Sequence, residues 1–148
     1  VLVHGARVLY ESAIITEYVD DLPSSQNKLM FEDPGLRAEV RIWTYWCNTR
    51  LKPDLDKFKY GESRFSASDC EGAEERLIQY LNKLEMSLSK SSWLVGEKFS
   101  LAEVNVFPFI RQLSRIQPAP EFLNQFPRLN SWREMISKRA SVELSLKL

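Results

Sequence analysis

The feature that most constrains the fold is a long helical pattern of apolar residues after Pro34. One stripe steps by three or four residues through Leu36, Val40, Trp43, Cys47, Leu51, Leu55 and Phe58. Pro53 lies inside it and lacks the backbone donor of a helix interior, so a kink is expected there. A second stripe comprises Ala73, Leu77, Leu81, Leu84 and Leu88. Further helices are expected at about 101–115, 119–125 and 128–138, with a final turn beyond Ala140.

The region before these helices has a different pattern. "VLVHGARVLYE" predicts two short strands around a turn at residues 4–6, and residues 12–20 predict one short helix. The segment 23–34 is polar, contains prolines and is expected to be a linker. Two strands and one helix cannot form a stable unit alone. Residues 1–22 must therefore pack on the helical part at 35–148, pair with another chain, or belong to a larger unit.

Composition argues against several classes of function. Twenty basic and twenty acidic residues give a formal charge of zero, which argues against binding to nucleic acid or to a membrane surface through a basic patch. No apolar run is long enough for a membrane span and no signal peptide is visible, so a cytoplasmic protein is expected. The only histidine is His4, which argues against a metal site and a Ser–His or Cys–His hydrolase. Cys47 and Cys70 are too far apart for a CxxC pair.

The stretch "EKFSLAEVNVFPFI" (97–110) predicts a strongly defined helix start. Ser100 and Glu103 have the spacing of a capping box, and Phe99 and Val104 that of a hydrophobic staple. The helix behind this cap is apolar nearly all round except at Asn105, so it is expected in the centre of the bundle. Such a cap stabilises a helix and performs no chemistry.

Glu11 and Ser12 stand where the second strand gives way to a helix, and two interpretations of this pair compete. Ser12 could cap the helix. Alternatively, its hydroxyl and a free backbone N–H could hold an anion, assisted by the helix dipole. Glu11 could then attract a neighbouring ammonium group, so that the pair would suit the zwitterionic head of an amino acid. The residues alone leave both interpretations open.

Three stretches in order, "VLVHGARVLYESAIITEYVDD", "WLVGEKFSLAEVNVFPFI" and "FPRLNSWREMISKRASVELSL", resemble the glutathione transferase superfamily, in particular its bacterial-type members. The resemblance implies that the Glu–Ser pair ends the last strand of a thioredoxin-like domain and opens its third helix. It also implies that the capped helix lies in the middle of an all-helical second domain. Two residues depart from the pattern: Glu103 stands where relatives mostly have Asp, and Ala140 where many have Pro.

The resemblance also implies particular sites. Glutathione would be bound as a substrate, without a metal, by Val1, Glu11 and Ser12. The acceptor-substrate pocket would use Tyr45, Asn48 and Thr49 on the first long helix, although these could equally be ordinary half-exposed residues. A homodimer is expected, because family members usually pair the first domain of one protomer with the second domain of the other.

The catalytic Ser, Tyr or Cys of the family lies in a segment that precedes the region matched by Val1. No catalytic residue is therefore expected within these residues, and a longer parent protein is expected. The resemblance implies that this parent transfers or exchanges the glutathione thiol with small electrophiles. The alternative is a non-catalytic glutathione transferase-like module that binds other proteins.

Overall fold

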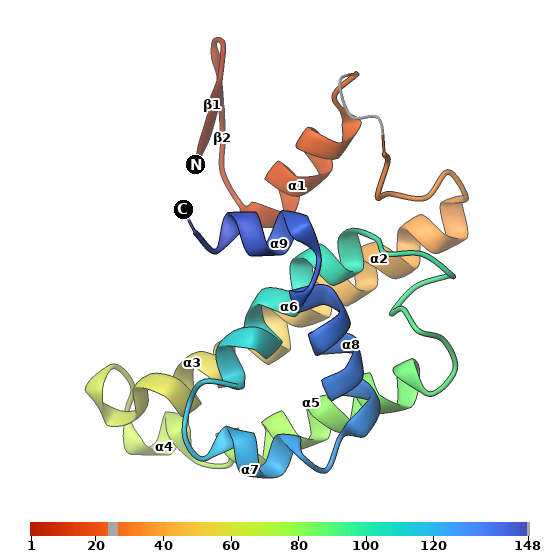
Figure 1. Ribbon diagram of the computed structural model, residues 1–148. Helices are drawn as coiled ribbons and strands as arrows, with labels where there is room; N and C mark the ends of the chain where they lie inside the picture. Colours follow the sequence, from red (N-terminus) through yellow and green to blue (C-terminus); the bar gives the residue numbers. More distant parts are fainter. Residues whose placement is uncertain (24–26, 148) are drawn as a thin grey trace.

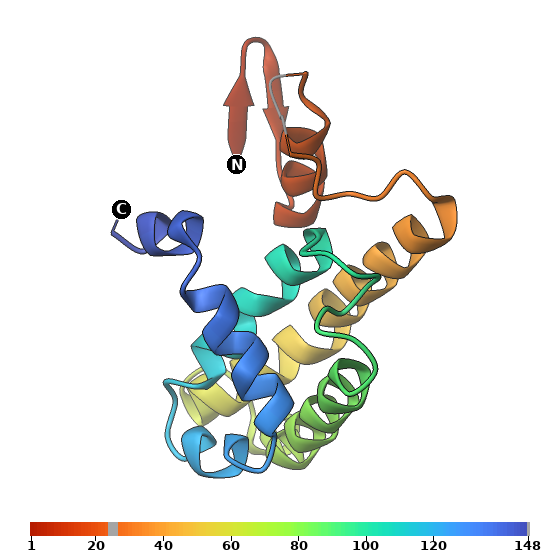
Figure 2. The same ribbon diagram turned by 45° about the vertical axis from the view of Figure 1, so that its right-hand side comes forward.

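The computed structural model describes residues 1–23 and 27–147, and it places a β-hairpin and a short helix at one end of a helical bundle (Figure 1). Strands β1 (Leu2–His4) and β2 (Arg7–Leu9) pair antiparallel, with Val3 opposite Val8. Gly5, at the turn, has a φ of 59°, which glycine adopts without a steric penalty. Helix α1 (Ser12–Asp21) follows directly. Figures 1 and 2 show that the hairpin projects from the bundle and that both chain termini lie at this end.

The rest of the described chain is helical, which confirms the mainly α fold expected from the apolar stripes. The long elements are α2 (Pro34–Trp46), a π-helical turn (Cys47–Leu51), α3 (Lys52–Tyr60), α5 (Ala73–Leu88), α6 (Leu101–Leu113) and α8 (Pro127–Ser137). Helices α7 (Ala119–Leu123) and α9 (Ala140–Ser145) are short.

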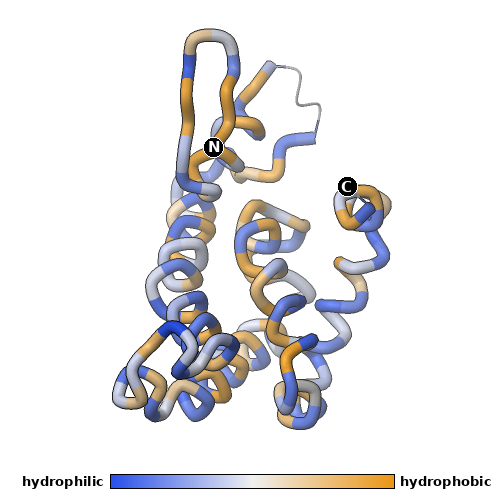
Figure 3. The backbone as a smooth tube through the Cα atoms, turned by 90° about the vertical axis from the view of Figure 1, so that its left-hand side faces the viewer, coloured by the Kyte–Doolittle hydropathy of each residue, from blue (hydrophilic) through white to orange (hydrophobic). Residues whose placement is uncertain are grey.

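The core is made by the inward stripes of these helices. Helix α2 packs on α6, α3 packs on α5, and α8 packs on both α5 and α6. The hydropathy colours alternate along each helix, as expected for amphipathic helices around a shared core (Figure 3). All five residues of the second predicted stripe are buried, and Leu77, Leu81 and Leu84 are completely inaccessible.

The interruption expected at Pro53 takes the form of a π-helical turn just before the proline. Pro53 is the second residue of α3, but the backbone before it is helical, with φ −59° and ψ −52° at Leu51. The proline therefore lies within a continuous helix, which has to accommodate its missing N–H. Cys47 and Leu51, at the two ends of the π-helical turn, remain fully buried. The extra residue per turn therefore accommodates the proline while the apolar stripe still faces the core.

Residues 61–70, between α3 and α5, form two short helical segments although their composition is polar. They contain a short 3-10 helix (Gly61–Ser63) and helix α4 (Ala67–Cys70). Ser66 caps α4 by accepting a hydrogen bond from the Asp69 amide at 3.2 Å, and the Asp69 carboxylate accepts from the Ser66 amide at 3.3 Å. This is a second capping box, and the apolar pattern alone could not reveal it.

The start of α6 is held by a dense set of hydrogen bonds. Ser100 is the N-cap, and its Oγ accepts from the Ala102 amide at 3.1 Å. Glu103 Oε2 accepts from the Ser100 amide at 2.9 Å and from the Ser100 hydroxyl at 2.8 Å. Glu103 Oε1 accepts from the Leu94 amide at 2.7 Å. The carboxylate therefore fixes the preceding loop as well as the helix start.

Part of the expected linker lies outside the described residues, at 24–26. The segment after it returns to α1 through Asp20, whose carboxylate accepts from the amides of Leu29 at 2.8 Å and Met30 at 3.0 Å. Lys28 Nζ also donates to the carbonyls of Asp20 and Leu22. These bonds anchor the described part of the expected linker to the C-terminal end of α1.

Candidate functional site

The junction between β2 and α1 has an unusual backbone conformation. Glu11 is the N-cap of α1 and has φ 66° and ψ 115°. It is the only residue other than glycine with a positive φ among residues 1–23 and 27–147. Such a conformation costs of order 1–3 kcal/mol and tends to occur at functional sites. Ser12 is the first helical residue and makes no capping bond, so the interpretation of Ser12 as the helix cap was wrong.

The first turn of α1 has backbone N–H groups that no carbonyl of the described chain accepts. The Glu11 carbonyl accepts from the Ile15 amide at 3.0 Å. In the described part of the chain, no carbonyl accepts from the amides of Ser12 and Ala13. Both Glu11 and Ser12 are exposed. Unpaired amides at the positive end of a helix dipole favour an anion such as a carboxylate.

Two contacts hold α1 from its outer sides. The ring Nδ1 of His4 lies 2.7 Å from the hydroxyl of Tyr18, which joins the hairpin turn to the helix. Glu17 accepts two hydrogen bonds from Arg41 of α2, at 3.1 and 2.9 Å. These bonds from Arg41 lower the pKa of Glu17. The pair is partly exposed, so its main effect is to fix the orientation of α1 rather than to add much stability.

A chain of half-buried polar side chains connects α1 with two helices of the bundle. Thr16 Oγ1 lies 3.3 Å from Asn105 Oδ1, and Asn105 Nδ2 donates to Thr44 Oγ1 at 3.1 Å. The thiol of Cys47 lies 3.6 Å from the Asn105 carbonyl. Burial raises the pKa of Cys47 to about 12, so this thiol stays protonated at neutral pH and is a poor nucleophile.

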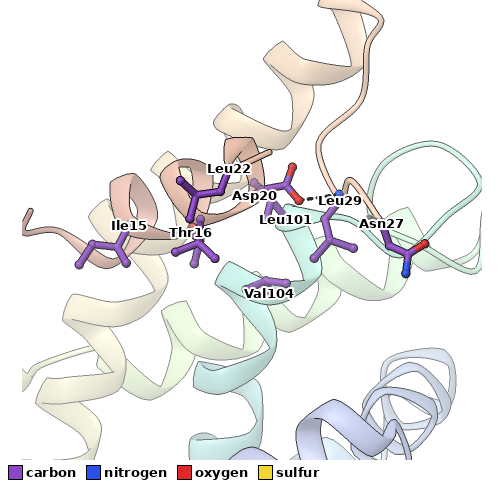
Figure 4. A pocket seen from close by; sticks show the side chains of 9 residues that line it. Ile15, Thr16, Asp20, Leu22, Asn27, Leu29, Leu101 and Val104 are labelled. Atoms are coloured by element: carbon purple, nitrogen blue, oxygen red, sulfur yellow. Dashed lines mark hydrogen bonds between the residues drawn. The ribbon is translucent and has the colours of Figure 1, made fainter. Parts of the chain in front are cut away.

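A cavity of about 440 Å³ lies between α1 and the start of α6 (Figure 4). Thr16, Asp20 and Asn27 are its polar lining residues. Its apolar lining includes Ile15, Leu29, Leu101 and Val104. Asp20 is 6% exposed and uses its carboxylate to hold Leu29 and Met30. This cavity is therefore a mostly apolar space beside α1, with its carboxylate already engaged.

The residues assigned to the acceptor-substrate pocket lie next to one another on the exposed surface of α2 and the π-helical turn. Tyr45 is 72% exposed on α2, and Asn48 and Thr49 are exposed on the π-helical turn. Thr49 Oγ1 donates to the Tyr45 carbonyl at 2.8 Å. None of the three lines the cavities described here, so their role stays a prediction. Val1, 90% exposed beside β1, also stays a prediction as a glutathione contact.

Sequence reasoning missed several residues that hold the site, among them Thr16, Asp20 and Asn105. Asn105 offered a clue, because it is the one polar residue within "VNVFPFI" and a buried amide needs partners. Asp20 offered no such clue, because its partners Leu29 and Met30 belong to a stretch of sequence without a periodic pattern. The pairing of Glu17 with Arg41 spans 24 residues and likewise has no local pattern.

The described residues contain neither a group of metal-binding side chains nor a helix that could span a membrane. No three side chains of His, Cys, Asp or Glu gather there in a way that could hold a metal ion. None of the helices described combines the length and hydrophobicity required to cross a membrane.

Known proteins resemble this chain in sequence and in fold. The family model "Glutathione S-transferase, C-terminal domain" matches residues 48–140. Glutathione S-transferase U19 of Arabidopsis thaliana is 26% identical over 99% of this chain and 66% of its own length. Several other plant glutathione S-transferases match at 22–26% identity over 65–66% of their lengths. The chain thus spans just under two thirds of these relatives.

Solved structures agree on the fold. Beta-etherase LigF of Sphingobium has a TM-score of 0.87 at 22% identity, over 97% of this chain and 75% of its own. A glutathione transferase of Pseudomonas putida, solved with one glutathione disulfide bound per subunit, has a TM-score of 0.82 at 20% identity, over 95% of this chain and 62% of its own. The family model covers more than half of the chain and the fold agrees along nearly all of it, so the protein belongs to the glutathione S-transferase family.

Proposed function

We propose that the protein is a glutathione-dependent transferase and that the start of α1 binds the γ-glutamyl end of glutathione. The observation that carries this proposal is the positive φ of Glu11 directly before the exposed residue Ser12, whose amide has no carbonyl partner in the described chain. Simple helix capping gives no reason for a strained glutamate at this position. The glutathione disulfide in the P. putida enzyme supports the choice of ligand.

The chemistry of the junction matches the two charges of the glutamyl head. Its α-carboxylate would accept hydrogen bonds from the Ser12 amide and hydroxyl, at the positive end of the α1 dipole. Its ammonium group would lie beside the Glu11 carboxylate. Charge-assisted bonds of this kind are stronger than neutral ones. The glutamyl head of glutathione would thus be held in one orientation, while the cysteinyl thiol would react at another place in the protein.

The proposed reaction of the whole protein is attack of the glutathione sulfur on a small electrophile. A sulfur–carbon bond forms, the thiol proton is lost, and the leaving group departs with the bonding electron pair. The proposal includes an acceptor site at Tyr45, Asn48 and Thr49. It also includes a thioredoxin-like part at 1–22, a linker at 23–34 and a helical domain at 35–148, in a cytoplasmic homodimer.

Calorimetry with Ser12→Ala tests the binding proposal. Glutathione should bind the native protein, and Ser12→Ala should weaken binding roughly tenfold, the usual effect of losing one charge-assisted hydrogen bond. Ser92 is exposed in the loop between α5 and α6, outside the proposed site. Ser92→Ala removes its hydroxyl and serves as the control. Equal affinities for all three proteins would contradict the proposed site.

Two truncated ligands make the test sharper. γ-Glutamylcysteine keeps the glutamyl head and should show the same loss with Ser12→Ala. Cysteinylglycine lacks that head and should bind the native protein and Ser12→Ala equally. If the native protein binds neither glutathione nor γ-glutamylcysteine, the alternative of a non-catalytic protein-binding module gains support and the transferase proposal fails.

A further inference from the structure

A second cavity, of about 340 Å³, lies between the end of α5 and helix α8. Leu88, Pro127 and Met135 contribute apolar surface to its wall, and Trp132 also lines it. None of these residues lines the cavity beside α1, and α5 lies at the end of the bundle away from α1 (Figure 1). A volume of this size is within the range of small-molecule sites.

The wall of this cavity includes a buried hydrogen-bond donor without an acceptor. Trp132 is only 2% exposed, and no acceptor among the described residues bonds its Nε1. The indole N–H can only donate, and a buried tryptophan N–H usually has a partner. An acceptor atom held in the cavity would supply the partner that the chain itself does not.

Ser131, the neighbour of Trp132 on α8, offers the opposite kind of group. It also lines the cavity, and its Oγ donates to the Pro127 carbonyl at 2.9 Å. Because the hydroxyl proton is engaged in that bond, the lone pairs of Oγ remain available to a donor. The cavity therefore presents one donor and one acceptor, and a matching ligand has to carry both kinds of group.

The charge of the wall does not require an anion inside the cavity. Arg128 is the charged residue among the described lining residues, and it is exposed, so water already solvates its guanidinium. A carboxylate in the cavity would lose hydration, and neither of its oxygens could donate to Ser131 Oγ. The hydrogen-bonding groups of the wall therefore favour a neutral ligand.

The two helices that form the cavity are joined by a carboxylate. Glu85 of α5 accepts from the backbone amides of Arg128 at 3.1 Å and Leu129 at 2.9 Å. These bonds hold the first turn of α8 against α5. The cavity walls are thus fixed before a ligand binds, which lowers the entropic cost of binding.

We propose that the cavity between α5 and α8 binds a neutral aromatic carboxamide. Its carbonyl oxygen accepts from Trp132 Nε1, and its NH₂ group donates to Ser131 Oγ, because a carboxamide carries both kinds of group. Its ring packs against Leu88, Pro127 and Met135, and methionine sulfur makes favourable contacts with aromatic rings. The site shares no residue with the α1 junction, so it can be tested without glutathione.

Benzamide is the probe, with two matched ligands of similar shape. Benzoate carries a charge and cannot donate, and acetophenone keeps the carbonyl and lacks the NH₂ group. The protein has four tryptophans, whose indole N–H signals can be followed by NMR during titration. Benzamide should shift the Trp132 signal and leave the other three in place, and it should bind roughly fivefold more tightly than benzoate or acetophenone. A Trp132 signal that stays in place, or equal affinities for the three ligands, would overturn the proposal.

Variants test the two hydrogen bonds separately. Ser131→Ala should weaken benzamide roughly fivefold and leave acetophenone unchanged. Ser137→Ala is the matched control, because Ser137 also donates to a carbonyl of α8, that of Arg133, and lies outside the cavity wall. Trp132→Phe keeps an aromatic ring and should weaken both ligands. If Trp132→Phe does not fold, Ser131→Ala decides: benzamide affinity that Ser131→Ala leaves unchanged, or that Ser137→Ala lowers equally, overturns the assignment.

Discussion

Glu103 has a wider role than a capping box requires. A capping box needs one carboxylate oxygen to reach back to the N-cap amide. Glu103 does this with Oε2, while Oε1 reaches the Leu94 amide in the loop before the helix. Glu103 is completely buried, and burial raises its pKa against the opposing effect of these bonds. The residue therefore joins the loop at 94–100 to the central helix.

Replacing Glu103 by Gln should destabilise the fold. The amide group of Gln has one acceptor oxygen, so the Leu94 amide or the Ser100 amide would face an NH₂ group and lose its bond. A buried donor left without a partner costs about 1–3 kcal/mol. Urea unfolding should show a lower midpoint with an unchanged slope. Glu134→Gln, at an exposed position on α8, is the control, and equal midpoints for the two variants would contradict this role.

Asp54 is a further acidic residue whose surroundings shift its pKa. Its carboxylate, 8% exposed, accepts two hydrogen bonds from Arg76, at 3.0 and 2.9 Å, and one from Tyr80 at 2.9 Å. Burial alone would raise the pKa of Asp54. The hydrogen bonds from Arg76 and Tyr80 outweigh it and hold the pKa below its ordinary value. This cluster joins α3 to α5.

The lowered pKa of Asp54 gives the stability a defined pH dependence. The unfolded chain binds the proton more readily, so the contribution is complete above the unfolded pKa of about 3.9 and is lost as pH falls through the folded pKa. The free energy of unfolding should therefore fall below about pH 4, and Asp54→Asn should flatten this fall. Parallel pH profiles for the native protein and Asp54→Asn, measured by urea unfolding, would contradict the assignment.

Residue patterns could be read from the sequence only where the partners are close along the chain. The Ser100–Glu103 pair spans three residues, and that spacing alone points to a helix start. Arg76 and Tyr80 lie 22 and 26 residues beyond Asp54. Nothing local distinguishes Asp54 from an exposed aspartate on α3. Long-range polar partners depend on how the helices pack, and the sequence does not encode that locally.

At the scale of elements, α1 is the helix whose position matters most for the proposed function. Contacts to the hairpin, to α2 and to α6 hold it, through His4–Tyr18, Glu17–Arg41 and Thr16–Asn105, respectively. The buried carboxylate of Asp20 also holds the segment that follows α1. The pairs with His4 and Arg41 lie at the surface and add little stability. The half-buried contact through Asn105 joins α1 to the central helix, so it should contribute more to the docking of α1 on the bundle than those two pairs.

Asn105→Ala should loosen α1 without unfolding the bundle. The change removes the contacts of Asn105 to Thr16 and Thr44. Both hydroxyls keep a hydrogen bond to a carbonyl of their own helix, so the expected cost is about 1 kcal/mol. Amide hydrogen exchange should accelerate in residues 15–21 and stay unchanged in α5, because local opening of α1 needs no global unfolding. Equal acceleration in both helices would mean that Asn105 stabilises the whole fold rather than α1.

The elements themselves could be predicted because each has a period. Apolar stripes located the long helices, and the turn around Gly5 located the hairpin. The apolar stripe around Pro53 correctly predicted which side of the helix is buried. The kink expected at the proline is instead a π-helical turn before it. Helix α4 was missed because its four residues carry no apolar period. A short helix of this kind can be recognised in a sequence only from its capping residue, here Ser66.

At the scale of the whole molecule, the mainly helical architecture followed from the sequence, whereas the two cavities did not. Each cavity is bounded by elements that lie far apart in the chain, α1 with α6 in one case and α5 with α8 in the other. Neither α1 nor α8 reveals its packing partner from its own composition.

The whole-molecule account depends on α1 presenting its first turn to a glutamyl head. The helical bundle fixes α1 through α6 and α2, and the hairpin delivers the chain to Glu11. Glu11 therefore lies between two anchored segments. Such anchoring can hold a backbone conformation whose free energy is about 1–3 kcal/mol above that of the relaxed one. The proposed glutamyl binding therefore depends on the amides of Ser12 and Ala13.

The most direct test records the amide NMR signals of the native protein during titration with γ-glutamylcysteine and, separately, with cysteinylglycine. The account predicts that the signals of Ser12 and Ala13 shift on saturation with γ-glutamylcysteine and stay in place with cysteinylglycine. Shifts that avoid the start of α1, or that are the same for both dipeptides, would contradict it.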